Sequence, residues 1–316
     1  MIDITLQNFQ TELINASTAQ PVLLDIWAPW CGPCRTLGPL LERLEVAYAG
    51  RFKLAKLNSD EQPQIAGQLS QMFGVRSIPF CVLFSQGQPV DGFVGALPES
   101  QIREFLDKHV PSTDELEAQA DVEEAEALLE EGDADAALHK LQAALQADPN
   151  NDSARFDLIR LLLEAGDADS ARSVFEPVAG RYGLDARLTA AGHWISAAHA
   201  ARRARDEAQL LTAISANRRD FGARFELAQT HFAAGRFTLA MDELLEIIMR
   251  DKAWNDELPR RTYVAILEII TKPQPRPAAA EAGTSKGGLE LTTKAPVPSG
   301  DPVVDQYRRK LSMALF

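Results

Sequence analysis

The sequence contains few cysteines, no excess of positive charge and no long apolar run. Its 32 Lys and Arg stand against 45 Asp and Glu, and the formal net charge is −13. This balance argues against nucleic acid or an anionic membrane as the main partner, because both attract a basic surface. No apolar run approaches the roughly 18 residues of a membrane span. The first residues lack the pattern of a secretory leader, so we expect a cytoplasmic protein with no membrane partner.

The length of 316 residues predicts about two domains, and the first 110 residues read as an α/β domain. Residues 22–28 and 53–60 are short β-rich runs, and residues 35–50 between them show the leucine spacing of a helix. Strands are then expected at 80–84 and 90–95, with a closing helix at 98–110. Parallel strands followed by a hairpin and a helix predict an α/β sandwich.

The stretch "DIWAPWCGPCR" places two cysteines at the end of a strand and in the first turn of a helix. The helix N-terminus stabilises a thiolate at Cys31, which lowers its pKa and makes it the attacking group. Cys34, one turn later, is placed to resolve a mixed disulfide. Pro33 fits between them because the first helical turn leaves its N–H unpaired in any case.

Two other roles for the pair are disfavoured. A zinc site needs two more ligands, but Cys81 is the only other cysteine and the five histidines show no ligand spacing with it, so we expect no metal and no cofactor. A structural disulfide would close too small a loop to stabilise much. Cys81 itself, inside the run "FCVLF", is expected to be a buried core residue.

Asp25 interrupts the apolar run that precedes the cysteines. Burial there would raise its pKa toward a range useful for proton transfer. The alternative is a carboxylate that merely ends a strand.

Residues 1–110 resemble thioredoxin in the motifs "WAPWCGPCR", "AKLNSDEQP", "GVRSIP" and "GFVGAL", which occur in the family's order. The resemblance implies the thioredoxin fold and protein-disulfide reductase activity, with Asp25 relaying a proton to or from Cys34 and Lys56 as its neighbour. It also implies a cis bond before Pro79, although the dipeptide alone allows trans. The implied substrate groove consists of Trp30, Gly32, Pro33, Ile78, Pro79 and Gly95.

Residues 113–272 change to alanine, leucine and acidic residues, and they repeat. Gly132 and Gly166 lie 34 residues apart in matching segments, and the segment from Ala154 returns from Ala223. A period near 34 with two helices joined by a glycine turn is typical of tetratricopeptide repeats. We expect four helical pairs, the third (185–217) degenerate, and a final helix at 256–270. Such arrays bind partners, or alternatively only stabilise or dimerise the chain.

The tail combines a predicted flexible linker at 273–300, rich in Pro, Ala and Gly, with a predicted amphipathic helix at 301–316. The helix carries an apolar stripe of Val304, Tyr307, Leu311 and Leu315 beside basic residues, which suits an apolar groove edged by acidic residues. That groove could belong to a partner or to the acidic repeats of the same chain. The candidate partner-binding residues are Tyr307, Arg308, Arg309, Leu311 and Leu315.

This order of domains resembles the chaperedoxin family of bacterial holdases. The resemblance implies that the protein binds unfolding or oxidised client proteins, protects their cysteines by exchange at Cys31 and Cys34, and passes them to the chaperonin GroEL. A dithiol reductant would recycle the pair. The alternative is a general cytoplasmic protein-disulfide reductase whose repeats select substrates.

Overall fold

The computed structural model describes residues 2–271 and 301–315, which form two compact units. The N-terminal unit comprises residues 2–116, and the repeat unit comprises residues 117–271 and 301–315. The linker expected at 273–300 lies outside the described residues. None of the helices within the described ranges is both long and apolar enough to cross a membrane.

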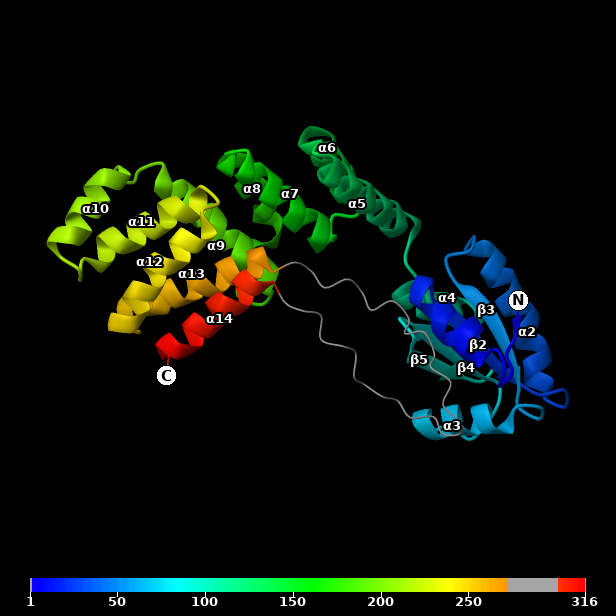
Figure 1. Ribbon diagram of the computed structural model, residues 1–316. Helices are drawn as coiled ribbons and strands as arrows, with labels where there is room; N and C mark the ends of the chain where they lie inside the picture. The colour runs from blue at the N-terminus through cyan, green and yellow to red at the C-terminus, as the bar shows by residue number, and fades with distance from the viewer. Residues whose placement is uncertain (1, 272–300, 316) are drawn as a thin grey trace. The chain divides into compact units, whose positions relative to one another are not determined.

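The N-terminal unit is built on a five-stranded mixed sheet of order β1-β3-β2-β4-β5. Figure 1 labels β2 to β5 of this sheet. The first three strands are parallel, and β4 pairs antiparallel with both β2 and β5. This arrangement confirms the predicted α/β domain. The sequence reading missed β1, because two residues carry no period. The strands are β1 (Ile2–Asp3), β2 (Val22–Trp27), β3 (Lys53–Asn58), β4 (Phe80–Ser85) and β5 (Gln88–Val94).

Helices cover both faces of this sheet. On one face, α2 (Gly32–Ala47) and α4 (Glu99–His109) share a core with Leu23 of β2. On the other, α3 (Pro63–Phe73) and the short helical segments η1 (Phe9–Asn15) and α1 (Ala16–Ala19) pack on Val22 and Leu24. Because successive side chains of a strand point to opposite faces, Asp25 lies on the α2 side.

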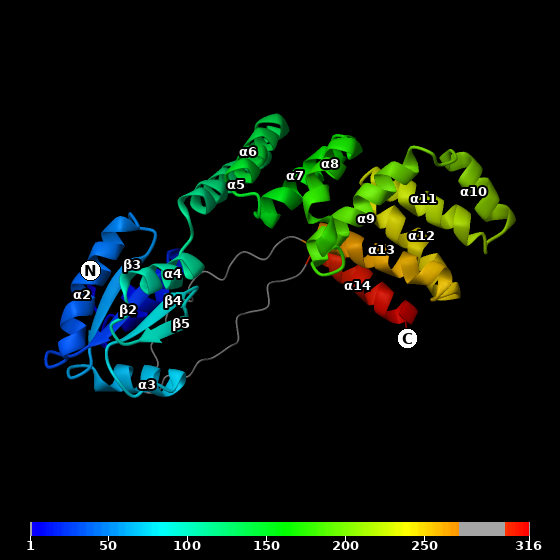
Figure 2. The ribbon, with the colours of Figure 1, turned by 180° about the vertical axis from the view of Figure 1, so that it is seen from behind.

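The repeat unit contains four successive helical pairs, followed by α13 and α14 (Figure 2). This confirms the predicted tetratricopeptide architecture, and a third helical pair forms where the sequence repeat is degenerate. The pairs are α5 (Thr113–Glu131, whose first four residues precede the start of the repeat unit) with α6 (Ala134–Ala147), α7 (Asp152–Glu164) with α8 (Ala168–Phe175), α9 (Ala186–Ala201) with α10 (Glu207–Ala216), and α11 (Phe221–Ala233) with α12 (Phe237–Arg250). The segment η2 (Glu176–Arg181) follows α8, and the last helices are α13 (Trp254–Ile270) and α14 (Pro302–Leu315).

Three of the turns between paired helices use a glycine in the left-handed region. Gly132, Gly166 and Gly235 have φ of 87°, 81° and 68°, a conformation that glycine adopts without the strain of a side chain. The alanines that follow each turn by five residues, Ala137, Ala171 and Ala240, are fully buried. The repeat seen in the sequence therefore includes both the glycine of each turn and a buried small residue in the helix that follows it.

Candidate redox site

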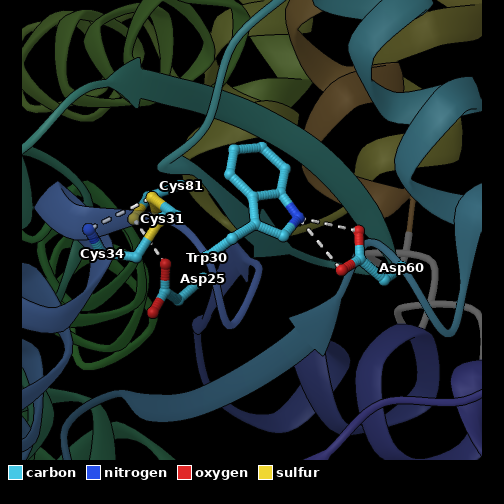
Figure 3. Close-up of a disulfide and its surroundings, with 6 residues drawn as sticks. All are labelled: Asp25, Trp30, Cys31, Cys34, Asp60 and Cys81. Atoms are coloured by element: carbon cyan, nitrogen blue, oxygen red, sulfur yellow. Dashed lines mark hydrogen bonds between the residues drawn. A yellow bond between two sulfur atoms is a disulfide. The ribbon is translucent and has the colours of Figure 1, made fainter.

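Cys31 and Cys34 form a disulfide, with their Cα atoms 5.3 Å apart (Figure 3). Cys31 immediately precedes α2, and the backbone N–H of Cys34 donates to Cys31 Sγ at 3.2 Å. Pro33 is the second residue of the helix and has no N–H to leave unpaired. The positive end of the helix therefore faces the Cys31 sulfur, where it stabilises a thiolate once the disulfide is reduced.

The cis-proline loop lies against this pair. Ile78 packs against the buried cluster of Ala28, Cys31 and Cys34. The Ile78–Pro79 bond is cis, in agreement with what the resemblance to thioredoxin implies.

Gly95 connects this loop to the end of β5. Its N–H donates to the Pro79 carbonyl at 2.8 Å. Its φ is 87°, and a Cβ built there would meet no atom within 4 Å. The missing side chain therefore leaves open space beside the cis-proline, where an extended backbone could lie.

Trp30 stands at the surface beside the disulfide, with 69% of its area exposed. Its indole Nε1 donates to the carboxylate of Asp60, at 3.1 and 3.3 Å from the two oxygens. Gly32, the first residue of α2, has open space where a side chain would be. Asp60 was not predicted from the sequence. It could have been, because Trp30 follows β2, Asp60 follows β3, and the loops after these parallel strands start from the same edge of the sheet.

Asp25 is 1% exposed and lies in the middle of the sheet, paired in register with Lys56 on β3 and Cys81 on β4. Burial raises the pKa of this carboxyl from 3.8 to about 6, against the opposing charge of Lys56. Cys81 Sγ lies 3.8 Å from Asp25 Oδ1 (Figure 3). Asp25 is therefore a desolvated group, and not a carboxylate that ends a strand.

The ammonium of Lys56 is engaged elsewhere. Its Nζ forms an ion pair with Glu42 of α2 at 2.6 Å. Lys56 is thus the neighbour of Asp25 across the sheet, but its ion pair is with Glu42. Glu42 was not predicted from the sequence. Among the described residues, no cluster of His, Cys, Asp and Glu could hold a metal ion.

The Asp25→Asn variant should be more stable than the wild type at pH 8. The folded state holds the Asp25 proton up to about pH 6, whereas an unfolded aspartate releases it near 3.8, so stability falls as pH rises through that interval. One unit of pKa difference is worth about 1.4 kcal/mol, which makes the expected gain on the order of 3 kcal/mol at pH 8. The gain should vanish toward pH 4. Hydrogen exchange of the β2 amides across this pH range measures it.

The matched control is Glu104→Gln, which removes one exposed carboxylate from α4. Its stability should track the wild type at every pH. A constant difference between Asp25→Asn and wild type from pH 4 to 8 would contradict the assigned cause.

The predicted terminal helix forms as α14 and packs on α12 and α13 within the repeat unit. Tyr307 is 6% exposed, and its hydroxyl and the Lys310 ammonium both reach Asp242, at 3.2 and 3.1 Å. Leu311 and Leu315 pack half-buried against the same core. Of the two grooves left open by the sequence, the apolar stripe occupies the one on its own repeats. Arg308 and Arg309 remain exposed.

Comparison with known proteins divides the chain in the same way. The thioredoxin family model matches residues 1–108, and two tetratricopeptide-repeat models match residues 128–195 and 200–281. A thioredoxin of Chlorobaculum thiosulfatiphilum is 48% identical over 104 residues, which are 33% of this chain and 91% of that protein. Thioredoxin 1 of Nostoc sp. is 42% identical over 107 residues, 34% of this chain and 94% of its own. The thioredoxin of Haemophilus influenzae is 42% identical over 103 residues, 33% of this chain and 91% of its own.

Proposed function

Because the chain belongs to the thioredoxin family through its N-terminal unit, we propose that it exchanges disulfides with client proteins that its own repeats hold. It is a thiol-disulfide oxidoreductase that acts through Cys31 and Cys34. The finer proposal is a holdase of the chaperedoxin type. The observation that carries it is the presence, in one chain, of this redox pair and of a tetratricopeptide-repeat unit with exposed apolar side chains.

The exchange begins when the Cys31 thiolate attacks one sulfur of a client disulfide. A Cys31–client bond forms, the client S–S bond breaks, and the other client sulfur leaves as a thiolate. Cys34 then attacks Cys31 Sγ, which closes the protein disulfide and releases the second client thiol. The client gains two electrons and the protein loses two. A dithiol reductant, the partner class expected from the sequence, restores the pair.

Asp25 serves the step in which Cys34 gains or loses its proton. As a carboxylate it accepts the Cys34 proton before the resolving attack, and as a carboxylic acid it protonates the Cys34 thiolate that leaves when a reductant opens the disulfide. A pKa of about 6 suits both directions near neutral pH. Burial supplies this value, so the same apolar run that forms β2 also prepares the proton carrier.

The groove for the client's extended backbone is the one between the disulfide loop, the cis-proline and Gly95. Ile78 contacts the cysteine cluster. The N–H of Gly95 donates to the Pro79 carbonyl, and Gly95 has open space where a side chain would be. Trp30, held by Asp60, forms the exposed wall. Gly32 and Pro33 complete the turn between the cysteines.

Clients are proposed to bind the repeat unit at apolar side chains near a hollow of about 570 Å³ between α9, α13 and the loop that precedes α9. Leu184 is 86% exposed, Val264 49% and Tyr182 47%. Exposed apolar groups of this kind are suited to apolar segments of unfolding proteins. The proposal places the protein in the cytoplasm, where a reducing pool keeps the cysteines active, and gives it GroEL as the receiver of its clients.

A pair of full-length double variants separates holding from exchange. Leu184→Asp with Val264→Asp should weaken suppression of the aggregation of a heat-unfolded client several-fold and leave insulin reduction unchanged. Cys31→Ser with Cys34→Ser should abolish insulin reduction and leave suppression of a cysteine-free client intact. Light scattering and insulin turbidity measure the two activities.

Leu6→Asp is the control, because Leu6 is an exposed leucine of the N-terminal unit, 55% accessible. It should hold clients as the wild type does. If the Leu184 and Val264 variant retains full suppression, the repeats do not hold clients at this hollow. If the wild type itself does not suppress aggregation, the holdase proposal fails and a general reductase is the remaining candidate.

A further inference from the structure

We propose that Glu42 and Cys81 are positioning residues that act on Asp25 from two sides and set how readily it gives up its proton. Glu42 acts by holding the Lys56 ammonium, and Cys81 acts by donating its thiol hydrogen to the carboxyl group. The proposal rests on the role given above to Asp25 in proton transfer. It concerns two residues that do not belong to the disulfide, the cis-proline loop or the groove.

The sheet register places Asp25 between its two strand neighbours. Lys56 lies directly across from it on β3, and Cys81 lies directly across from it on β4. All three belong to adjacent central strands of the sheet, and α2 packs on the face to which Asp25 points. The neighbours of the carboxyl group are therefore fixed by backbone pairing and not by flexible loops.

Cys81 is suited to be a permanent donor. Its side chain is buried, with 1% of the residue exposed, and its Sγ lies 3.8 Å from Asp25 Oδ1 (Figure 3). Burial raises the pKa of the Cys81 thiol well above its ordinary value, so the sulfur keeps its hydrogen at neutral pH. A thiol is a weak donor, but a buried carboxylate gains from any donor that favours its charged form.

Glu42 acts through Lys56. The 2.6 Å ion pair holds the ammonium on the α2 side, where the Glu42 side chain is 43% exposed and that of Lys56 only 17%. The positive charge of Lys56 lowers the pKa of Asp25, and the negative charge of Glu42 raises it. Without Glu42, the ammonium has no carboxylate partner on α2 and its full charge acts on Asp25.

The charged and titratable groups that act on Asp25 come from each element packed around it. They are Lys56 from β3, Cys81 from β4 and Glu42 from α2, which also carries the disulfide. Two of them favour the carboxylate and one favours the acid. The two proposed residues therefore predict opposite effects when they are removed, and a general loosening of the fold would not produce opposite signs.

The test measures Asp25 directly in the oxidised full-length protein, by the pH titration of its side-chain carboxyl ¹³C resonance, which is assigned from its absence in Asp25→Asn. Glu42→Gln should move the midpoint down, and Cys81→Ala should move it up, each by roughly half a pH unit. Cys81→Ser keeps a donor and should stay close to the wild type. Glu104→Gln removes a remote exposed carboxylate and should not move the midpoint.

The second readout is the pH dependence of disulfide reduction by dithiothreitol, in which protonated Asp25 supplies the proton to Cys34. Up to a certain pH, protonated Asp25 should make the reduction faster than attack by the dithiothreitol thiolate alone would be. That pH should shift with the ¹³C midpoint in each variant. Unmoved midpoints in both Glu42→Gln and Cys81→Ala, or shifts of one sign, overturn the inference. If Asp25→Asn keeps the wild-type pH dependence, the proposed role of Asp25 fails instead, whatever the ¹³C midpoints show.

Discussion

Cys31→Ser is expected to lower the rate of insulin reduction by at least about a thousandfold, since loss of a covalent nucleophile removes the exchange step itself. The structure places Cys31 before α2, with its sulfur accepting the Cys34 N–H, and a serine hydroxyl in that position is not ionised at neutral pH. Insulin turbidity with dithiothreitol as reductant measures the loss. The melting temperature of the reduced protein should be unchanged.

Cys34→Ser separates the two cysteines. It keeps the attacking thiolate and removes the resolving one, so client proteins should accumulate as mixed disulfides at Cys31, visible as reductant-sensitive bands. Cys31→Ser should trap none. Equal trapping by both variants would contradict the division of roles, and trapping by Cys31→Ser alone would reverse it.

The redox site was predictable where its chemistry is local in sequence. Cys31, Pro33 and Cys34 lie within one turn, so the helix start and the direction of its dipole follow from a few residues. Asp25 was predictable as a buried acid because its apolar neighbours belong to the same strand.

The parts that sequence reasoning missed depend on the packing of elements distant in the chain. Glu42 reaches Lys56 because α2 packs against β3. Cys81 was expected to be a plain core residue, and its burial is confirmed, but its contact with Asp25 depends on the antiparallel register of β2 and β4. A one-residue slip of that register would turn Cys81 to the opposite face.

In the repeat unit too, the sequence predicted the helices but not the contacts between elements distant in the chain. The period near 34 predicted the helical pairs, and the glycine turns confirm it. The repeats also contain contacts that the period did not predict. Arg155 and Arg224 occupy equivalent positions in two repeats, and both are buried. Arg155 donates to the carbonyls of Pro149 and Val174. The position of α14 does not follow from the repeat period, because its apolar stripe suits a groove on the repeats of the same chain and a groove on a partner protein equally well.

Tyr307→Ala is expected to lower the free energy of unfolding of the repeat unit by about 3–5 kcal/mol, the cost of removing a buried aromatic side chain. Tyr307 is 6% exposed, and its backbone carbonyl accepts the Tyr263 hydroxyl at 2.8 Å. The truncated side chain would leave a cavity between α14 and its neighbours and a lost partner for Asp242. Urea denaturation followed by circular dichroism measures the change.

The matched variant on the same helix is Arg309→Glu, which alters an exposed side chain with no ion-pair partner among the described residues. Its unfolding curve should coincide with that of the wild type. If Tyr307→Ala also unfolds as the wild type does, α14 contributes nothing to the repeat unit and its packing is not stabilising.

The same two variants decide how a chaperonin could use α14. While the helix is docked, Arg309 is exposed and the apolar stripe is not, whereas Arg308, although exposed, donates to Thr271 Oγ1 at 3.2 Å. The proposed GroEL adaptor would therefore bind through the exposed side that carries Arg309. Arg309→Glu should then weaken co-purification with GroEL at unchanged stability, and deletion of residues 301–316 should abolish it.

If GroEL instead required the apolar stripe, binding would first have to release α14 from α12 and α13. In that case Arg309→Glu would bind as the wild type does, and Tyr307→Ala would lose binding together with stability. Binding that survives the deletion would remove α14 from the adaptor proposal altogether.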